Sequence, residues 1–206
     1  MSSLLDLIVV VADADAERTI ETLLEDRRAS LKIRGINFAI LRADHDAGTF
    51  LRSPDLLREY SKTADFALVL LDREGSGKEA VMSADEMEQD LEQRLQRVGW
   101  NESNSRVIVL DPELEIWVWS SSPHLKAVMN VSDEQLKVVL EKFPPAGSAN
   151  KPNHPKEAMH HALKLGRKPF SPCLFQELAA IVSLKNAHER AFLRLRDTLQ
   201  AWFTLG

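Results

Sequence analysis

Cysteine and long apolar runs are scarce in this 206-residue chain. Its single cysteine, Cys173, excludes a disulfide framework and any zinc site built from several thiolates. No apolar run approaches the roughly 20 residues that a membrane-spanning helix needs, so we expect no membrane partner. The first residues, MSSLLDLIVVV, lack the basic leader and small-residue cleavage site of a secretory signal, and we therefore expect a cytoplasmic protein.

The charge is distributed unevenly along the chain. Residues 151–206 contain nine Lys and Arg against four Asp and Glu, whereas residues 1–150 contain 17 basic and 27 acidic residues. An acidic body with a basic final segment is compatible with a metal-binding face beside a phosphate-binding one. The alternative is that the charges are scattered over solvated helix faces, and the sequence leaves both interpretations open.

Short, β-branched apolar runs that end in acidic residues predict the core of the fold. Runs of this kind are typical of parallel strands covered on both faces. The runs and the acids that follow them are Leu4–Ala12 before Asp13 and Asp15, Phe66–Leu71 before Asp72, and Arg106–Leu110 before Asp111. A weaker strand is expected at Ile36–Leu41.

Segments with helical spacing of apolar residues alternate with these strands and then dominate the second half. The predicted helices are Ala16–Leu24, Pro54–Tyr60 with Ser53 as its cap, Ala84–Val98, Val131–Phe143, Pro155–Leu165, Pro172–Val182 and roughly His188–Phe203. Alternating strands and helices predict an α/β fold with a mostly parallel sheet flanked by helices. We place this body at residues 1–125 and a helical C-terminal extension, packed on it, at residues 126–206.

The acids at the strand ends are the first candidates for a functional site. Ligands of open α/β sheets bind outside the carboxyl ends of the strands, and neighbouring parallel strands lie about 4.8 Å apart. Carboxylates that converge there need a cation, and Mg²⁺ prefers such oxygen ligands. The alternative is that each acid caps a helix or begins a turn. The candidates are Asp13, Asp15, Asp72, Glu74, Asp111, Glu113 and Glu115.

Three short motifs resemble those of a known family. Asp72-Arg73-Glu74-Gly75 resembles the second acidic motif of the TOPRIM domain, which topoisomerases, primases and the overcoming-lysogenization-defect nucleases share. Glu113-Leu114-Glu115-Ile116-Trp117 and Ala191-Phe192-Leu193-Arg194-Leu195 resemble the Glu-x-Glu-Ala-Trp block and the Ser-Phe-x-x-Leu ending of small bacterial TOPRIM-like proteins. With Lys156-Glu157-Ala158 at a helix start, most of the chain is similar to a component of methylation-associated phage-defence systems.

This resemblance implies a TOPRIM-like fold and a nuclease or phosphodiesterase that depends on Mg²⁺ or Mn²⁺ and serves a prokaryotic anti-phage system. It also implies nucleic acid and other defence-system subunits as partners. The implied metal ligands are Asp13, Asp72, Glu74, Asp111, Glu113 and Glu115, with Asp13 in the acid/base position and Asp13, Asp72 and Glu74 as the catalytic set. Tyr60, the only tyrosine, lies in a predicted helix, which argues against topoisomerase-type covalent chemistry.

The chain departs from the family at the end of the first strand. TOPRIM enzymes place a glutamate followed by glycine there, whereas this chain has Ala12-Asp13-Ala14-Asp15. Asp13 has a shorter side chain, and the glycine that shapes the turn is missing. An adaptor or binding subunit that has lost catalysis is therefore the alternative function.

Two further groups are weighed as contacts for phosphate. Lys156, Lys164, Arg167 and Lys168 are predicted to form a basic stripe that holds a nucleic-acid backbone. Their alternative role is to stabilise the C-terminus of a helix through its macrodipole. The segment His45-Asp46-Ala47-Gly48 follows the second strand and can lie at the same edge as the acids, but we favour a plain loop turn.

Overall fold

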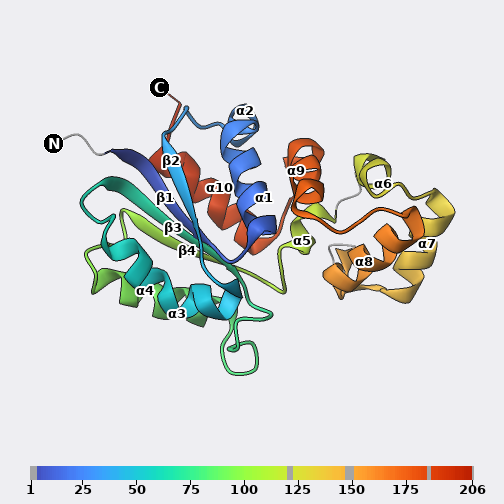
Figure 1. Ribbon diagram of the computed structural model, residues 1–206, viewed down its shortest axis with the longest axis horizontal. Coiled ribbons are helices and arrows are strands. Elements are labelled where there is room, and N and C mark those ends of the chain that lie inside the picture. The colour runs from blue at the N-terminus through green and yellow to red at the C-terminus, as the bar shows by residue number, and fades with distance from the viewer. Residues whose placement is uncertain (1–3, 120–122, 147–150, 185–186, 206) are drawn as a thin grey trace.

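Four parallel strands form the centre of the protein in the computed structural model (Figure 1). The structure describes residues 4–119, 123–146, 151–184 and 187–205. The strands, in the spatial order β2-β1-β3-β4, are β1 (Leu5–Val11), β2 (Phe38–Arg42), β3 (Ala64–Asp72) and β4 (Ser105–Leu110). All three pairings are parallel, which confirms the predicted α/β class. The chain moves outward in one direction after β1 and in the other after β3, so these two strand ends flank the switch point where ligands bind in open sheets.

The central strands are apolar at nearly every position because both of their faces are covered. Val9 and Leu68 contribute to the core on one face of the sheet, whereas Val10 and Val69 contribute to the core on the other. All four side chains are fully buried. Their uninterrupted apolar sequence is the signal that predicted these strands.

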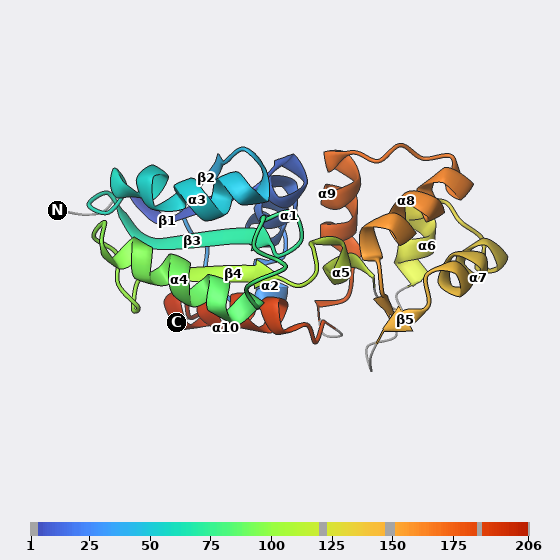
Figure 2. The same cartoon turned by 90° about the horizontal axis from the view of Figure 1, so that it is seen from below.

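Helices cover both faces of the sheet (Figures 1 and 2). One layer contains α3 (His45–Arg58) and α4 (Ala84–Gln96), and the other contains α1 (Ala14–Glu25), the short α2 (Arg28–Leu31) and α10 (Arg190–Trp202). Asp13 caps α1, and Ser83 and Glu86 form a capping box on α4. Across the described ranges, we find no helix with the combined length and apolarity that a bilayer span demands.

The predicted start of α3 at Pro54 is wrong, because Pro54 lies inside a helix that begins at His45. Proline has no amide hydrogen, so the carbonyl of Phe50 loses its usual partner four residues later. Arg94 of α4 supplies a replacement, with its Nη2 donating to the Phe50 carbonyl oxygen at 2.8 Å. This contact explains why the helix continues through a residue that usually marks a helix start. Because α3 begins at His45, residues 45–48 are helical, and the expected loop turn there is wrong.

The second half of the chain is helical, as predicted, and forms two groups. Its elements are α5 (Glu115–Val118), α6 (Pro123–Met129), α7 (Asp133–Lys142), the short ladder of β5 (Pro145–Ala146) and β6 (Lys151–Pro152), α8 (Pro155–Gly166) and α9 (Pro172–Ile181). We call α6, α7 and α8 the lobe; it lies beside the sheet in Figures 1 and 2. In contrast, α9 packs on α1, and α10 packs on β4. One hydrophobic cluster runs from the sheet into the lobe, and the division at residue 125 stays a prediction.

Side chains of α4 close the outer edge of β4. Glu88 accepts a hydrogen bond from the Val109 amide at 2.9 Å, and Glu92 accepts one from the Val107 amide at 3.1 Å. Two arginines of α10 also donate to these carboxylates: Arg190 to Glu88 at 2.9 Å and Arg194 to Glu92 at 2.9 Å. We call these four side chains the Glu88 network: Glu88, Glu92, Arg190 and Arg194. It uses backbone donors that an edge strand otherwise leaves unpaired.

Candidate metal centre

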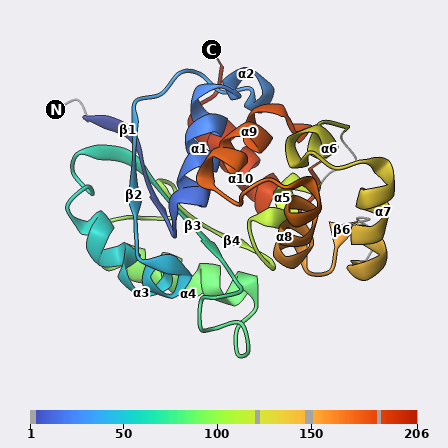
Figure 3. The same ribbon diagram turned by 45° about the vertical axis from the view of Figure 1, so that its right-hand side comes forward.

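The parallel sheet brings the predicted acidic residues to one edge. Asp13 lies two residues after the end of β1, Asp72 is the last residue of β3, and Glu113 and Glu115 follow β4. Figure 3 shows α5 and α8 beside this end of the sheet. The side chains that the sequence places at three separate strand ends are therefore neighbours in space.

Three of these carboxylates form a close group. Asp72, Glu113 and Glu115 each offer one oxygen, and the three oxygens lie within 4.8 Å of one another. Glu113 and Glu115 are only 4% and 3% exposed. Oxygen donors at this spacing suit a hard cation such as Mg²⁺, which keeps several waters and needs only one or two carboxylates.

A small cavity lies beside the close group. Its volume is about 10 Å³, enough for one ion or one water molecule but not for a nucleotide. The lining includes four aspartates, Glu115 and one lysine, Lys156. Together with Glu113, the acidic lining defines what we call the carboxylate pocket: Asp13, Asp15, Asp46, Asp72, Glu113 and Glu115.

Asp46 is a member of the pocket that sequence reasoning missed. It lies in the first turn of α3, and its Oδ1 accepts a hydrogen bond from the Asp72 amide at 2.7 Å. This bond fixes the end of β3 against α3. The available signal was the position of Asp46 soon after a predicted strand, which we had interpreted as a loop turn.

Burial makes the carboxylate pocket hard to ionise completely. Burial raises the pKa of Glu115 to about 7, and the charge of Glu113 acts in the same direction. Burial also raises the pKa of Asp46 to about 6. The pKa of Asp72 lies well above its ordinary value because of burial and the charges of Asp46 and Glu115. The pocket therefore holds more negative charge near neutral pH than its surroundings stabilise.

Lys156 is the cation nearest to this charge among the residues lining the cavity. Its Nζ lies 4.0 Å from an oxygen of Glu113 and 4.0 Å from one of Glu115. Its backbone amide also donates to Glu113 at 2.9 Å. Burial alone would lower the pKa of Lys156, but Glu115 and Glu113 raise it above its ordinary value. Because Lys156 belongs to α8, the lobe supplies one wall of the pocket.

One oxygen of the pocket has no partner. Oε2 of Glu115 is buried and makes no hydrogen bond within the part of the chain that the structure describes. An unsatisfied buried acceptor costs about 1–3 kcal/mol and more when it is charged. A cation bound to Glu115 and its two neighbours would satisfy this oxygen, so the residues fit a metal ion.

The remaining predicted acids lie around the close group. Asp13 lines the pocket, but its Oδ1 caps α1 by accepting from the Ala16 amide at 2.9 Å. Glu74 is exposed and lies outside the close group, although its charge contributes to the raised pKa of Glu113 after burial, the main cause. Asp111 is also exposed and pairs with Arg73 at 3.4 Å. The structure thus places Glu74 and Asp111 at the rim.

The predicted basic stripe is divided by the length of α8. Lys156 lies at the start of this helix and Lys164 in its last turn, so the two are about 12 Å apart along the axis. Arg167 is exposed just beyond the helix, whereas Lys168 pairs with Glu177 at 3.1 Å. Lys156 therefore belongs to the carboxylate pocket, and Lys164 and Arg167 lie near the other end of α8.

The pocket combines three carboxylate oxygens within 4.8 Å of one another, a buried oxygen without a hydrogen-bond partner among the described residues, and a lysine from α8. These features suit the binding of a cation and of a phosphate group next to it. They rest on the geometry of this chain alone. Comparison with models of known protein families, with curated proteins and with solved structures finds no match.

Proposed function

We propose that the carboxylate pocket binds Mg²⁺ or Mn²⁺ and that the protein is a TOPRIM-like, metal-dependent nuclease or phosphodiesterase of a prokaryotic anti-phage system. The observation that carries the proposal is Oε2 of Glu115, which lies in the group with Asp72 and Glu113 and has no hydrogen-bond partner in the described part of the chain. Most buried polar atoms in proteins have a hydrogen-bond partner, and a bound ion is one explanation for an oxygen without one. The TOPRIM-like motifs at Asp72–Gly75 and Glu113–Trp117 support the assignment to nucleic-acid chemistry.

Four carboxylates of the pocket and Lys156 have distinct roles in this proposal. Asp72, Glu113 and Glu115 hold the ion, which supplies Lewis-acid stabilisation of the phosphoryl group. Lys156 Nζ, at the open side of the pocket, binds a phosphate oxygen. Asp13 keeps one oxygen on the helix cap and presents the other as the acid or base.

The cavity size restricts where a substrate binds. With about 10 Å³ available, the scissile phosphate has to lie at the mouth of the cavity and the rest of the nucleic acid on the surface. Lys164 and Arg167 are exposed at the far end of α8 and extend this surface. Contacts of this kind bind phosphates without reading the base sequence.

A non-catalytic adaptor is the second candidate, and two observations favour it. The acid/base position holds Asp13, whose Oδ1 is already used by the Asp15 and Ala16 amides. Lys156 also provides part of the positive charge that a metal would supply. In this case the pocket binds an ion or a phosphate, and the protein acts by docking on other defence-system subunits.

Thermal melting with and without Mg²⁺ or Mn²⁺ tests the metal site. Binding to the folded state raises the melting temperature of the wild type. We expect Asp72→Asn to lose most of this rise, because a neutral amide is a poorer ligand for a hard cation. Without metal, the variant should melt at the same or a higher temperature. Burial raises the pKa of the Asp72 carboxyl group, so its ionised form is unfavourable, and asparagine cannot ionise. Asp111→Asn is the control, because that exposed rim residue should leave the metal response unchanged.

Cleavage assays then separate the two candidate functions. Single-stranded and double-stranded DNA and RNA are incubated with the wild type and with Asp72→Asn in the presence of Mn²⁺. Cleavage by the wild type alone supports the nuclease. A metal response that depends on Asp72 without cleavage of any substrate favours the adaptor. An equal metal response in both proteins would remove Asp72 from the site and reject the metal centre.

A further inference from the structure

The outer side of β2 is open, in contrast to the closed edge of β4. The Asn37 carbonyl and the Ala43 amide both bond to β1. Because backbone groups alternate in direction along a strand, those of Phe38 and Ile40 point away from β1. In the described ranges, no hydrogen bond outside the β1–β2 ladder uses the backbone of Phe38 or Ile40. An edge of this kind is a template for another strand.

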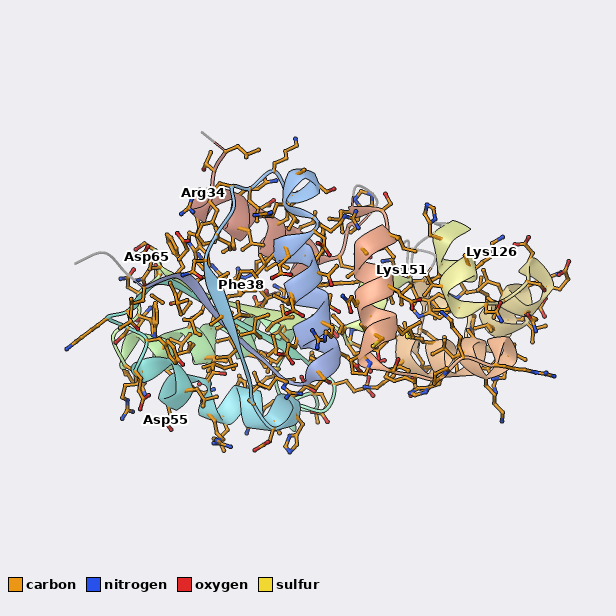
Figure 4. The ribbon with its side chains drawn as sticks, turned by 45° about the horizontal axis from the view of Figure 1, so that its top comes forward. Arg34, Phe38, Asp55, Asp65, Lys126 and Lys151 are labelled. Carbon is orange, nitrogen blue, oxygen red and sulfur yellow. The ribbon has the colours of Figure 1, made fainter. Side chains whose placement is uncertain are left out.

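A groove runs along this open edge, between β2 and α1. Its volume is about 320 Å³, and its floor includes Phe38 and Ile40. Figure 4 labels Phe38 on β2, next to α1. The charged residues that line the groove are all acidic: Glu17, Glu21 and Glu25 of α1. We call this feature the β2–α1 groove.

The spacing of the three glutamates matches the repeat of an extended strand. They follow one another every four residues, which corresponds to a rise of about 6 Å along the helix. Side chains on one face of a strand recur every two residues, or about 6.7 Å. A strand paired with β2 that carries a basic residue at every second position therefore places each cation near one glutamate.

The present partners of the glutamates do not block such a strand. Glu17 pairs with Arg42 at 3.2 Å, and Glu21 pairs with Arg18 at 2.5 Å. Both arginine side chains are about half exposed, so these surface pairs contribute little and exchange readily. Glu25 has no ion pair with any residue that the structure describes.

We propose that the β2–α1 groove binds an extended segment of a partner protein that carries Lys or Arg at alternate positions and adds to the sheet as a fifth strand. A second copy of this chain is a poor occupant, because pairing β2 with β2 brings two rows of glutamates together. Nucleic acid is repelled by the same row. The Glu88 network closes β4, so strand addition is directed to the β2 edge. This inference does not depend on whether the carboxylate pocket cleaves a phosphodiester.

Fluorescence anisotropy at low ionic strength provides the test, with a short labelled peptide in which lysine alternates with valine as the probe. We expect the wild type to bind it and Glu21→Lys to weaken binding about tenfold, because the change replaces an attraction with a repulsion. Glu141→Lys is the matched control, because Glu141 is also a helical glutamate with a basic neighbour, Lys137 at 3.8 Å. Equal weakening by the two variants, or no binding by the wild type, would overturn the proposal.

Backbone methylation of the probe tests strand addition separately from charge. Two versions carry N-methyl groups at alternate residues, one version on each side of the peptide strand. We expect one version to lose binding and the other to keep it, because only one side of an added strand donates to β2. The version that loses binding reports whether the strand is parallel or antiparallel. Equal behaviour of the two versions would exclude strand addition.

Discussion

The carboxylate pocket and the Glu88 network both contain a buried glutamate, but the two glutamates differ in their hydrogen-bond partners. Glu88 is 2% exposed and Glu115 is 3% exposed, so burial does not distinguish them. Both oxygens of Glu88 are bound by Arg190, at 2.9 and 3.0 Å, and one also accepts the Val109 amide. Oε1 of Glu115 lies 4.0 Å from Lys156 Nζ, and its Oε2 has no hydrogen-bond partner among the described residues.

The difference indicates which group serves stability and which serves a ligand. A buried carboxylate with complete hydrogen bonding fixes the elements around it, here α4, β4 and α10. A buried carboxylate with an empty lone pair reduces the free energy of unfolding until something binds it. Local disagreements of this kind are expected at functional sites. The comparison therefore predicts that replacing Glu88 lowers the free energy of unfolding, whereas replacing Glu115 raises it in the metal-free protein at alkaline pH.

The largest effect is expected from Glu88→Ala. The change leaves the Val109 amide without its acceptor and removes both hydrogen bonds that Arg190 makes with Glu88. Breaking a buried ion pair in this way costs about 3 kcal/mol or more. Urea unfolding followed by circular dichroism measures the loss. Gln89→Ala, at an exposed position on the same helix, is the control and should be nearly neutral. A loss below about 1 kcal/mol would show that the network is not structural.

Glu115→Gln should stabilise the metal-free protein at alkaline pH. The pKa of Glu115 rises from 4.5 in the unfolded chain to about 7 in the folded protein, so the folded state holds this proton more tightly. Stability consequently falls as pH rises through this window, by an amount on the order of 3 kcal/mol, and is level above it. Glutamine cannot ionise and removes this slope.

Unfolding free energies of wild type and Glu115→Gln between about pH 4 and 9 check this expectation. Glu59→Gln is the matched control, because Glu59 is exposed at the end of α3, does not line the pocket and should leave the slope unchanged. Mg²⁺ should reduce the slope in the wild type only. A pH profile that is the same in wild type and Glu115→Gln would mean that Glu115 is as well satisfied as Glu88, and the comparison would fail.

The smallest effect is expected from Lys156→Met. Methionine keeps most of the aliphatic volume but removes the cation 4.0 Å from Glu113 and Glu115. Because the lysine side chain is 46% exposed, solvent reduces the interaction, and we expect a loss of about 1 kcal/mol near pH 8. Near pH 5 the loss should be smaller, because Glu115, whose pKa burial raises to about 7, is then protonated. A loss that is equal at both pH values would assign Lys156 to packing.

Local sequence signals predicted the sheet well. Strands buried on both faces leave uninterrupted apolar runs, and the predicted Phe66–Leu71 lies inside β3 (Ala64–Asp72). The predicted helix Val131–Phe143 likewise contains α7, whose start is marked by a capping box of Ser132 and Gln135. The start of α3 was missed because the contact that replaces the bond lost at Pro54 comes from Arg94, 40 positions later in the chain.

The candidate site was predicted only where strand ends determined it. Asp72 and Glu115 were found because parallel strands end at one edge. Glu74 was expected beside Asp72, because side chains two residues apart lie on the same face of a strand. However, β3 ends at Asp72, and the chain then enters a turn in which Gly75 has φ 82°. Asp46 was missed because its place beside Asp72 depends on the spatial order of the strands, which no local pattern encodes.

The bonds of Lys156 also make the pocket and the lobe a single thermodynamic system. Its amide and its amine both contact Glu113, so the start of α8 is held against the sheet by the same charge that a metal ion or phosphate would engage. Linkage is reciprocal: a ligand that changes this charge alters the free energy of docking the lobe, and a protein that moves the lobe alters the affinity for the ligand by the same factor. A partner that binds α6, α7 or α8 and moves the lobe therefore changes the affinity of the carboxylate pocket for its ligand.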